Sequence, residues 1–519
     1  MLRITGYSDK YSVHPREKVK FYINSESNEN YEVQIVRLIH GDTNPEGPGY
    51  KEEELGASCN GNYEGRNQRI HGGSYVIIPQ DERMNVGSFT LQAYIFPTTP
   101  DKGKQGILTK WNETSSSGYG LFVDDDGCLS LMIGDGDGQV FKISSEKKLI
   151  RKVWYLVAAS FDAETGKVIL YQEPTVTPTN GGLGMSLLHP IDETSAIVES
   201  SNNVKPGKND SPFLMAASTV VDRSGRHITG GHYKEALTPV ELPEQGFVFN
   251  GKIDRPRLSN KVLSKDEIKN LSSGYGGCTS DLRTKVVGAW DFHANITNNI
   301  ASTFIADISP SHLNGFIINL PCRGMTGYNW TADEIVYHHK PEEYGAIHFH
   351  DDDIDDARWE VDFVYDVPDK IRSGFYAARL RINGDDSSET EDFVPFVIKP
   401  PKGKATSKLA LIVPTNSYLA YSNDNLGTNS VVAQLLAGKV PVLAASDLYL
   451  NEHREYGLST YSLHSDGSGV CYSSRLRPIL NMRPKYRHWL SPSLWQLNGD
   501  LHLTDWLEEK GFDFDCLTD

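Results

Sequence analysis

The feature that most constrains this chain is a long succession of short strand-like runs separated by turn residues. From Ser74 to about residue 272, β-branched and aromatic runs recur between Gly, Pro, Asn and Asp clusters, as in Tyr75–Ile78, Phe89–Ile95 and Trp154–Phe161. Regular spacing of short strands is typical of two antiparallel sheets packed face to face. The sequence therefore predicts a two-sheet jelly roll in this part of the chain.

A chain of 519 residues is too long for a single hydrophobic core, so several domains are expected. Alternating apolar and polar residues predict a small Ig-like antiparallel sandwich at the N-terminus, residues 1–73. The jelly roll is assigned to residues 74–275, and further strand-like runs predict a β-rich domain at 276–402. The last of these either completes the first sandwich, which makes the jelly roll an insertion, or stands alone.

The pattern changes in residues 403–519. The run Leu409–Val413 is continuously apolar, which predicts a strand buried on both faces of a mostly parallel sheet. Ser430–Leu436 and Thr504–Lys510 are predicted helices, and Phe512–Leu517 is a further predicted strand. This is the start of an α/β domain. Such an open sheet needs more strands to cover its helices, so we expect the remainder of the domain to lie beyond this chain.

The composition excludes several classes of partner. Lys and Arg number 51 against 68 Asp and Glu, and the net charge of −17 repels phosphate backbones and anionic lipids, so neither nucleic acid nor a membrane is an expected partner. No stretch approaches the ~20 apolar residues of a membrane span and the N-terminus lacks a signal-peptide pattern, so a cytoplasmic location is expected. Six scattered cysteines without a CxxC pair argue against a zinc site or a disulfide framework.

Two polar segments of the α/β part could carry chemistry. Ligand sites in open α/β sheets lie beyond the carboxyl ends of the strands, which favours the run Pro414–Asn423 after the apolar strand. A second run, Gly457–Gly469, is too polar for a core strand and brings Tyr, His and Asp close together.

Two resemblances connect these segments with known families. The order of strands in the jelly roll, with the closing segment Phe249–Leu258, resembles laminin-G and concanavalin-like modules. Nearly the whole chain resembles the N,N-dimethylformamidase large (beta) subunit family, and the stretches Arg323–Trp330, Ile347–Asp353 and Gly457–Gly469 carry this likeness in the same order.

The second resemblance implies a mononuclear iron, Fe(III), on a glutamine-amidotransferase-like fold. It implies that Tyr421 and Tyr461 are metal ligands, with Tyr418 as an alternative to Tyr421, and that a glutamate ligand follows the present end of the chain. It further implies hydrolysis of small N-alkylated formamides to formate and an amine, a small partner subunit and a homo-oligomeric assembly. If the missing segment is absent from the molecule, the truncated subunit is expected to be inactive.

The chemistry of phenolate agrees with that ligand set. A phenol has a pKa of about 10, so only a strong Lewis acid deprotonates it at neutral pH, which favours a trivalent ion. Release of the amine needs a proton donor, and His464 is the histidine within the second polar run, so it is the candidate catalytic residue.

Other interpretations remain open at this stage. His348 and His350 could share a metal with Asp351, Asp352 and Asp353, but an acidic turn after a strand explains them more simply. The chain could also be a carbohydrate-binding protein without catalysis, in which the jelly roll recognises sugar. A phenolate-to-iron absorption band would favour the interpretation as a hydrolase. Glycan binding by residues 74–272 would favour the interpretation as a carbohydrate-binding protein.

Overall fold

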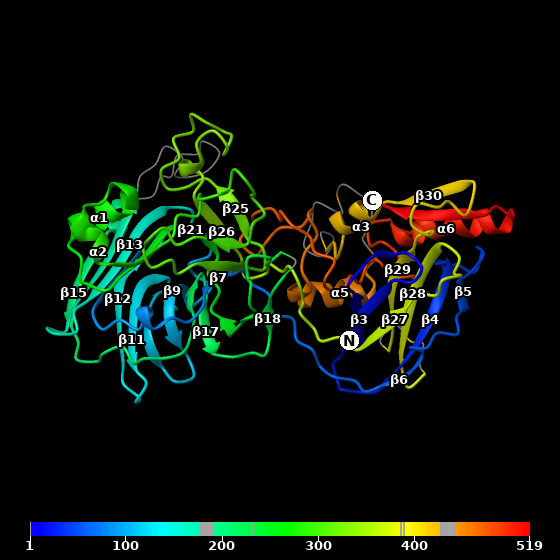
Figure 1. The fold of residues 1–519 in the computed structure, drawn as a ribbon, viewed down its shortest axis with the longest axis horizontal. Helices are drawn as coiled ribbons and strands as arrows, with labels where there is room; N and C mark the ends of the chain where they lie inside the picture. Colours follow the sequence, from blue (N-terminus) through cyan, green and yellow to red (C-terminus); the bar gives the residue numbers. More distant parts are fainter. Residues whose placement is uncertain are drawn as a thin grey trace. The chain divides into compact units, whose positions relative to one another are not determined.

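The structure of the chain is a computed structural model. It describes residues 2–175, 191–230, 232–384, 387, 390–425, 435, 438, 440, 442–491 and 493–519. The chain divides into two compact units: residues Met1–Gly72 with Ile354–Asp519, and residues Gly73–Asp353 (Figure 1). As predicted, the chain is mostly β.

The first unit contains a sandwich of two sheets. One sheet has the order β1-β3-β27 and the other the order β2-β29-β28-β4-β5, with β6 also on β4. Their facing side chains form one core that includes Phe21, Val33, Tyr376 and Phe396. The strands are β1 (Ile4–Ser8), β2 (Ser12–Val13), β3 (Lys18–Ser25), β4 (Tyr31–His40), β5 (Lys51–Glu54), β6 (Gly61–Tyr63), β27 (Phe363–Asp366), β28 (Gly374–Ile382) and β29 (Glu391–Ile398).

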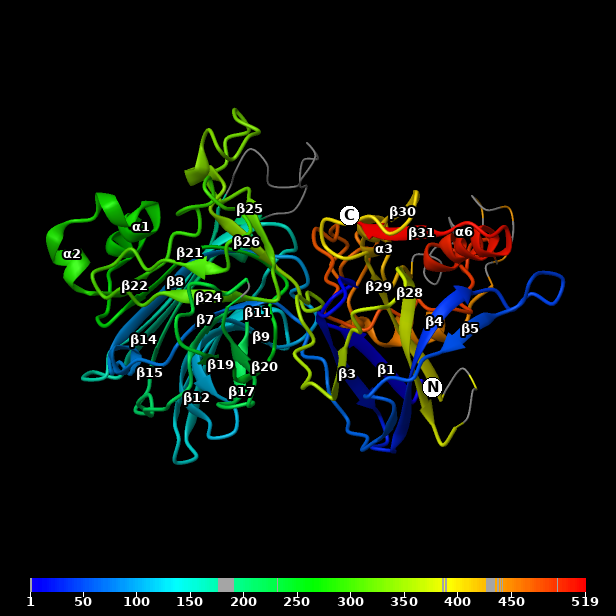
Figure 2. The ribbon, with the colours of Figure 1, turned by 45° about the vertical axis from the view of Figure 1, so that its right-hand side comes forward.

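The outer face of the β28 sheet carries the α/β part of the first unit. Strands β30 (Leu409–Val413) and β31 (Phe514–Thr518) form a parallel pair, and α6 (Leu497–Glu509) lies beside β4 in Figure 2. Leu501, Val413 and Phe514 join Phe375 in a second core. The remaining helices are α3 (Thr415–Ala420), η5 (Arg454–Tyr456) and α5 (Ala445–Glu452).

Two larger sheets face each other in the second unit. They have the orders β12-β11-β10-β9-β16-β7-β24-β23 and β15-β14-β13-β8-β21-β26-β25, and Phe89, Leu121 and Trp290 lie in the core between them. The strands are β7 (Tyr75–Ile78), β8 (Phe89–Pro97), β9 (Gln105–Asn112), β10 (Ser117–Val123), β11 (Cys128–Asp135), β12 (Val140–Lys148), β13 (Trp154–Phe161), β14 (Lys167–Thr175), β15 (Ala196–Ser201), β16 (Phe213–Met215), β17 (Ser218–Val221), β18 (His227–Ile228), β19 (Val240–Glu241), β20 (Glu244–Gly246), β21 (Gly251–Ser259), β22 (Val286–Ala289), β23 (Phe304–Ile305), β24 (Gly315–Ile318), β25 (Cys322–Met325) and β26 (Ala346–Phe349).

Short helices lie at the edges of these sheets. The longest, α1, begins with a capping box in which Ser264 and Glu267 satisfy each other's backbone N–H groups. Its buried side chains Ile268 and Leu271 pack against β8 and β13 residues such as Tyr94 and Trp154. The helices are α1 (Lys265–Ser273), α2 (Ser280–Thr284), η1 (Glu82–Met84), η2 (Ile191–Thr194), η3 (Tyr275–Gly277) and η4 (Pro341–Glu343).

The structure divides the predicted segment 276–402 between the two units. Strands β22 to β26 pair within the second unit, whereas β27, β28 and β29 pair with β3, β4 and β2 of the N-terminal sandwich. The sequence showed strand-like runs throughout this segment, but the choice of partner depends on residues hundreds of positions away. Residues 73–353 thus lie between the two parts of the first unit in the sequence.

The prediction for Leu409–Val413 needs a correction. This run is a strand, but Leu409 is 43% and Ile412 66% exposed, so it is not buried on both faces. In the described residues β30 pairs along one edge only, with β31. Helix α6 begins at Leu497, before the predicted Thr504, because Leu497 and Leu501 face the core. Most of the predicted helix 430–436 lies outside the described residues.

All six cysteines fall within the described residues, and none forms a disulfide, as the sequence predicts. Among the described helices, none is both long and apolar enough to cross a membrane.

Candidate metal centre

Tyr421 follows the first strand of the α/β part after one short helix. After β30, Pro414 precedes the short helix α3, and Tyr421 closes that helix with its N–H donating to the Ser417 carbonyl at 3.2 Å. Its own carbonyl accepts a hydrogen bond of 2.7 Å from the Asn481 side-chain amide. The backbone at Tyr421 is therefore held from both sides.

Tyr461 lies on the second polar segment, which is tied to the end of α3. The N–H and the hydroxyl of Thr460 both donate to the Ala420 carbonyl at 3.0 Å. The N–H of Tyr461 donates to the hydroxyl of the buried Ser459 at 3.2 Å. These contacts bring the residue before Tyr461 against the residue before Tyr421.

The two tyrosine side chains lie together. Their rings stack with centroids 4.3 Å apart and planes 13° from parallel. Interaction with the neighbouring Tyr461 phenol is the main cause that raises the pKa of Tyr421, and burial adds to it. Trp495 packs edge-on against Tyr421 at 5.5 Å, while Tyr461 stays 52% exposed. Both hydroxyls can therefore reach one point at the surface of this unit.

Tyr418, the alternative ligand, has a different environment. It is buried, and its hydroxyl donates a short hydrogen bond to the Asp500 carboxylate of α6. Burial, reinforced by Asp500, raises the pKa of Tyr418 well above its ordinary value. The phenol is thereby kept protonated as a donor within the core.

His464 lies in a tight turn on the same segment as Tyr461. Leu463 and Gly469 form a β-bridge, and within it the His464 N–H donates to the Ser468 carbonyl at 2.9 Å. The Gly467 N–H donates back to the His464 carbonyl at 2.9 Å. The turn fixes the backbone of His464 three residues after Tyr461, and its catalytic role stays a prediction.

A buried guanidinium links the segments on which the two tyrosines lie. Arg477 is 1% exposed, burial lowers its pKa to about 10, and the described residues provide it with no ion pair. It is stabilised by hydrogen bonds alone. They go to the carbonyls of Tyr456 (2.6 Å), Leu458 (2.9 Å) and Ser474 (2.9 Å) and to the hydroxyls of Ser422 (2.7 Å) and Ser473 (3.1 Å).

Asn423 makes a second link two residues after Tyr421. It has φ of 56°, a left-handed conformation that Asn tolerates, and is 1% exposed. Its side-chain amide donates to the carbonyls of Tyr456 and Pro478, both at 3.0 Å, and its oxygen accepts from the Leu480 N–H at 2.8 Å. Sequence reasoning included Asn423 in the favoured run without giving it a role, and it missed Arg477, because only the tertiary fold shows which polar side chains are buried.

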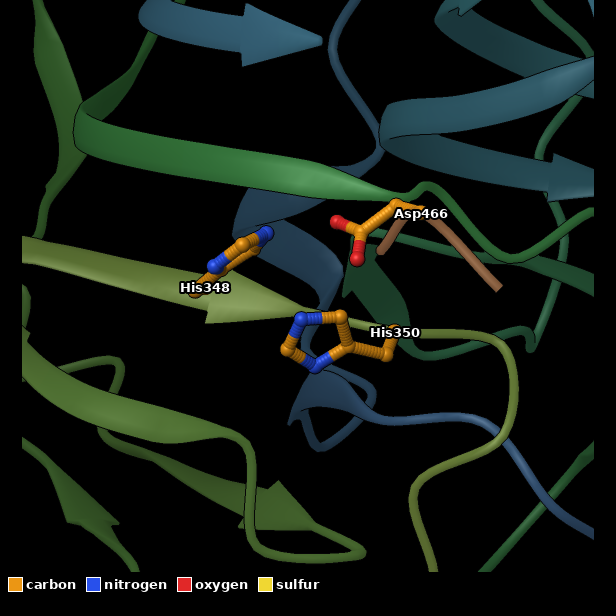
Figure 3. A group of neighbouring side chains, drawn as sticks. All are labelled: His348, His350 and Asp466. Atoms are coloured by element: carbon orange, nitrogen blue, oxygen red, sulfur yellow. The ribbon is translucent and has the colours of Figure 1, made fainter. Parts of the chain in front are cut away.

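The histidine pair of the second unit is also ordered by local contacts. His348 and His350 project from the same side of β26 and the residue after it, with ring centroids 4.1 Å apart (Figure 3). His350 Nδ1 lies 3.1 Å from Asp353, whose carboxylate also accepts from Ser74 at 2.6 Å. Lys102 forms an ion pair with Asp351 at 2.8 Å. Asp351 and Asp353 thus each have a partner within their own unit.

Comparison with known proteins shows which proteins the chain is similar to. Residues 323–519 match the family model described as N,N-dimethylformamidase beta subunit-like, C-terminal. The N,N-dimethylformamidase beta subunits of Paracoccus aminophilus and of an Alcaligenes species are 38% and 37% identical to the chain over its whole length. The chain is thus similar over its entire length to N,N-dimethylformamidase beta subunits. It spans 65% of the length of each of these two relatives.

The C-terminal match includes both Tyr421 and Tyr461 as well as Asn423 and Arg477. Residues 71–186 match a model of the concanavalin A-like lectin and glucanase superfamily, which confirms the predicted laminin-G/concanavalin-like fold of the second unit. Among solved structures, the CBM40 module of Ruminococcus gnavus IT-sialidase matches 39% of this chain and 95% of its own, at 16% identity and a TM-score of 0.23. The glutamine-amidotransferase-like character of the α/β part stays a prediction.

Proposed function

We propose that the chain is part of the large subunit of an iron-dependent amide hydrolase that splits small N-alkylated formamides into formate and an amine. The observation that carries this proposal is the stacked pair of Tyr421 and Tyr461, in a region that matches the N,N-dimethylformamidase beta subunit. Two relatives of that name align with the entire chain.

The tyrosine pair fits the chemistry of a ferric ion. The two rings stack 4.3 Å apart with nearly parallel planes, so one ion could take both phenol oxygens as ligands. Phenolate is a hard, anionic oxygen donor that a trivalent ion favours. A bound ferric ion would supply a Lewis acid that polarises an amide carbonyl and lowers the pKa of water. The family resemblance implies a glutamate as the third protein ligand.

The chain's own residues have two further tasks. Thr460 and Asn481 fix the backbone on either side of the tyrosine pair, so that the phenol oxygens stay close without rearrangement. The departing amine needs a proton, and we assign this role to His464, which the tight turn after Tyr461 holds in place.

The assembly is part of the same proposal. The relatives are named beta subunits, which supports an enzyme of more than one kind of subunit. We propose a small partner subunit and a homo-oligomeric arrangement of the large one.

Absorption spectroscopy tests the metal assignment. The complete protein is titrated with Fe(III), and a visible phenolate-to-iron band is expected in the wild type. Tyr421→Phe and Tyr461→Phe should each shift or abolish this band, whereas Tyr472→Phe, which removes the hydroxyl of another exposed tyrosine, should leave it unchanged. Release of dimethylamine from N,N-dimethylformamide by the complete protein tests the reaction.

Two outcomes would count against the proposal. A band that survives both substitutions would place the iron elsewhere, and the complete protein failing to release amine with iron bound would exclude the reaction. If the chain instead binds glycans and shows no iron band, the carbohydrate-binding alternative is favoured.

A further inference from the structure

A cluster of unsatisfied polar atoms lies within the second unit, in the segment that closes the jelly roll. Both carboxylate oxygens of Asp254, Nδ1 of His293 and Oδ1 of Asn329 are buried without a hydrogen-bond partner among the described residues. Asp254 as a whole is fully buried. Leaving a buried polar atom unpaired costs about 1–3 kcal/mol, and more for a charged group, so four such atoms in one place need an explanation.

Two glycines show that these atoms converge. A Cβ atom placed on Gly345 would lie 3.0 Å from Oδ1 of Asp254 and 3.5 Å from Nδ1 of His293. A Cβ atom placed on Gly327 would lie 2.6 Å from Oδ2 of Asp254 and 3.0 Å from Oδ1 of Asn329. The carboxylate therefore faces the imidazole on one side and the amide oxygen on the other, beside positions where the chain carries no side chain.

Local strand geometry aims Asp254 at this place. The pairing of β21 with β8 shifts register between Asp254 and Arg257, and Arg255 inside the shift has φ of 49°. Such bulges redirect side chains and recur beside functional sites. His293 follows β22 and Asn329 follows β25, so three separate segments contribute one polar group each.

The charged side chains next to Asp254 are paired with other residues. Arg257 pairs with Asp291, and Arg255 donates to the carbonyls of Ser272 and Ser273 and to the Tyr328 hydroxyl. Burial raises the pKa of Asp254 to about 6 and Asp291 adds to this rise. The positive charges of Arg255 and Arg257 oppose this rise in the pKa. The Tyr328 N–H also opposes it, although it is not in hydrogen-bond geometry with the carboxylate.

We propose that Asp254, His293 and Asn329 bind a divalent transition-metal ion, such as Mn²⁺ or Zn²⁺, inside the second unit. Each unsatisfied atom can act as a lone-pair donor, so a cation satisfies all of them together, whereas one water molecule has only two hydrogens to donate. Carboxylate and amide oxygens suit Mn²⁺, and a neutral imidazole nitrogen extends the set to Zn²⁺. This site is independent of the tyrosine pair, which belongs to the other unit.

Metal titration of the full chain tests the site. The chain is stripped with a chelator, Mn²⁺ is added at pH 7.5, and free Mn²⁺ is measured by electron paramagnetic resonance, with Zn²⁺ as competitor. We expect one Mn²⁺ per chain that depends on Asp254. Asp254→Asn and His293→Gln should each weaken binding by at least about tenfold. Asn329→Asp, which adds a negative ligand, should tighten it by about tenfold.

Controls separate this site from other metal binding. Asp266→Asn removes an exposed carboxylate of α1 and should change nothing, and Tyr421→Phe should leave this Mn²⁺ in place. Circular dichroism verifies folding, and His293→Gln serves as the deciding variant if Asp254→Asn does not fold. A wild-type chain that binds neither ion, or a folded variant of Asp254 or His293 that keeps full affinity, would overturn the proposal and leave ordered water as the partner.

Discussion

The removal of the Asn423 side chain is the sharpest test of how the tyrosine pair is held. Asn423→Ala leaves the buried Leu480 N–H and the Pro478 carbonyl without their hydrogen-bond partners. The Tyr456 carbonyl still accepts a hydrogen bond from Arg477. Each lost partner costs about 1–3 kcal/mol. The left-handed backbone at φ 56° adds about 1 kcal/mol for alanine. Together these effects predict a loss of about 3–7 kcal/mol in the free energy of unfolding of the first unit.

A series of variants separates the two contributions. Asn423→Gly loses the same hydrogen bonds but adopts positive φ without strain, so it should be about 1 kcal/mol more stable than Asn423→Ala. Asn28→Ala is a matched control, because Asn28 has the same φ of 56° but is exposed, and should cost only the backbone strain and one exposed hydrogen bond from the Asn67 N–H.

Urea denaturation measures the free energy of unfolding of each variant. Hydrogen exchange of residues 456–481 then shows where the structure is loosened. The exchange of the Leu480 amide should accelerate strongly in Asn423→Ala and remain unchanged in Asn28→Ala. A loss below about 1 kcal/mol in Asn423→Ala would refute the reasoning, since that is less than one unsatisfied buried donor costs. Equal stability of the alanine and glycine variants would refute the strain component.

Three further predictions concern titration and metal choice. Tyr461→Phe removes the phenol whose interaction raises the pKa of Tyr421, so that pKa should fall towards its ordinary value in an NMR titration of labelled tyrosine; an unchanged pKa would contradict the pairing. Tyr418→Phe should keep the iron band but lose about 1–3 kcal/mol of stability, because Asp500 loses its donor; loss of the band would favour Tyr418 as ligand. In the metal-free chain, the pKa of Asp254 is raised to about 6, so its contribution to stability is present below about pH 4 and lost as pH rises towards 6; Asp254→Asn should flatten this part of the stability profile, and an unchanged profile would contradict it.

The sequence predicted the elements better than their partners. The alternation in Lys18–Ile23 and the apolar run Leu409–Val413 correctly indicated strands, because strand formation follows from local patterning. Whether β26 pairs in the first or the second sandwich could not be predicted, since both sheets accept an apolar strand of that kind. The exposure of Ile412 was missed for the same reason: a continuous apolar run shows what can be buried, and the neighbouring elements decide what is.

The candidate site shows the same division. Family motifs pointed to Tyr421 and Tyr461, which are 40 positions apart in the sequence, but no periodicity predicted that their rings would stack. The residues that hold them had no sequence signal. Ser, Asn and Arg are ordinarily surface residues, so Ser422 and Arg477 look like loop residues until the fold encloses them.

The position of the tyrosine pair must come from this polar network rather than from hydrophobic packing. Tyr461 is half exposed, so burial of its ring contributes little to holding it. Its backbone is fixed instead through Thr460 to the end of α3, which Asn423 and Asn481 anchor in turn. Hydrogen bonds have strict geometry, which makes such a network suited to setting the distance between two oxygens. It follows that changes in Asn423 or Asn481 should disturb metal binding as strongly as the loss of one phenol, although neither residue contributes a proposed ligand.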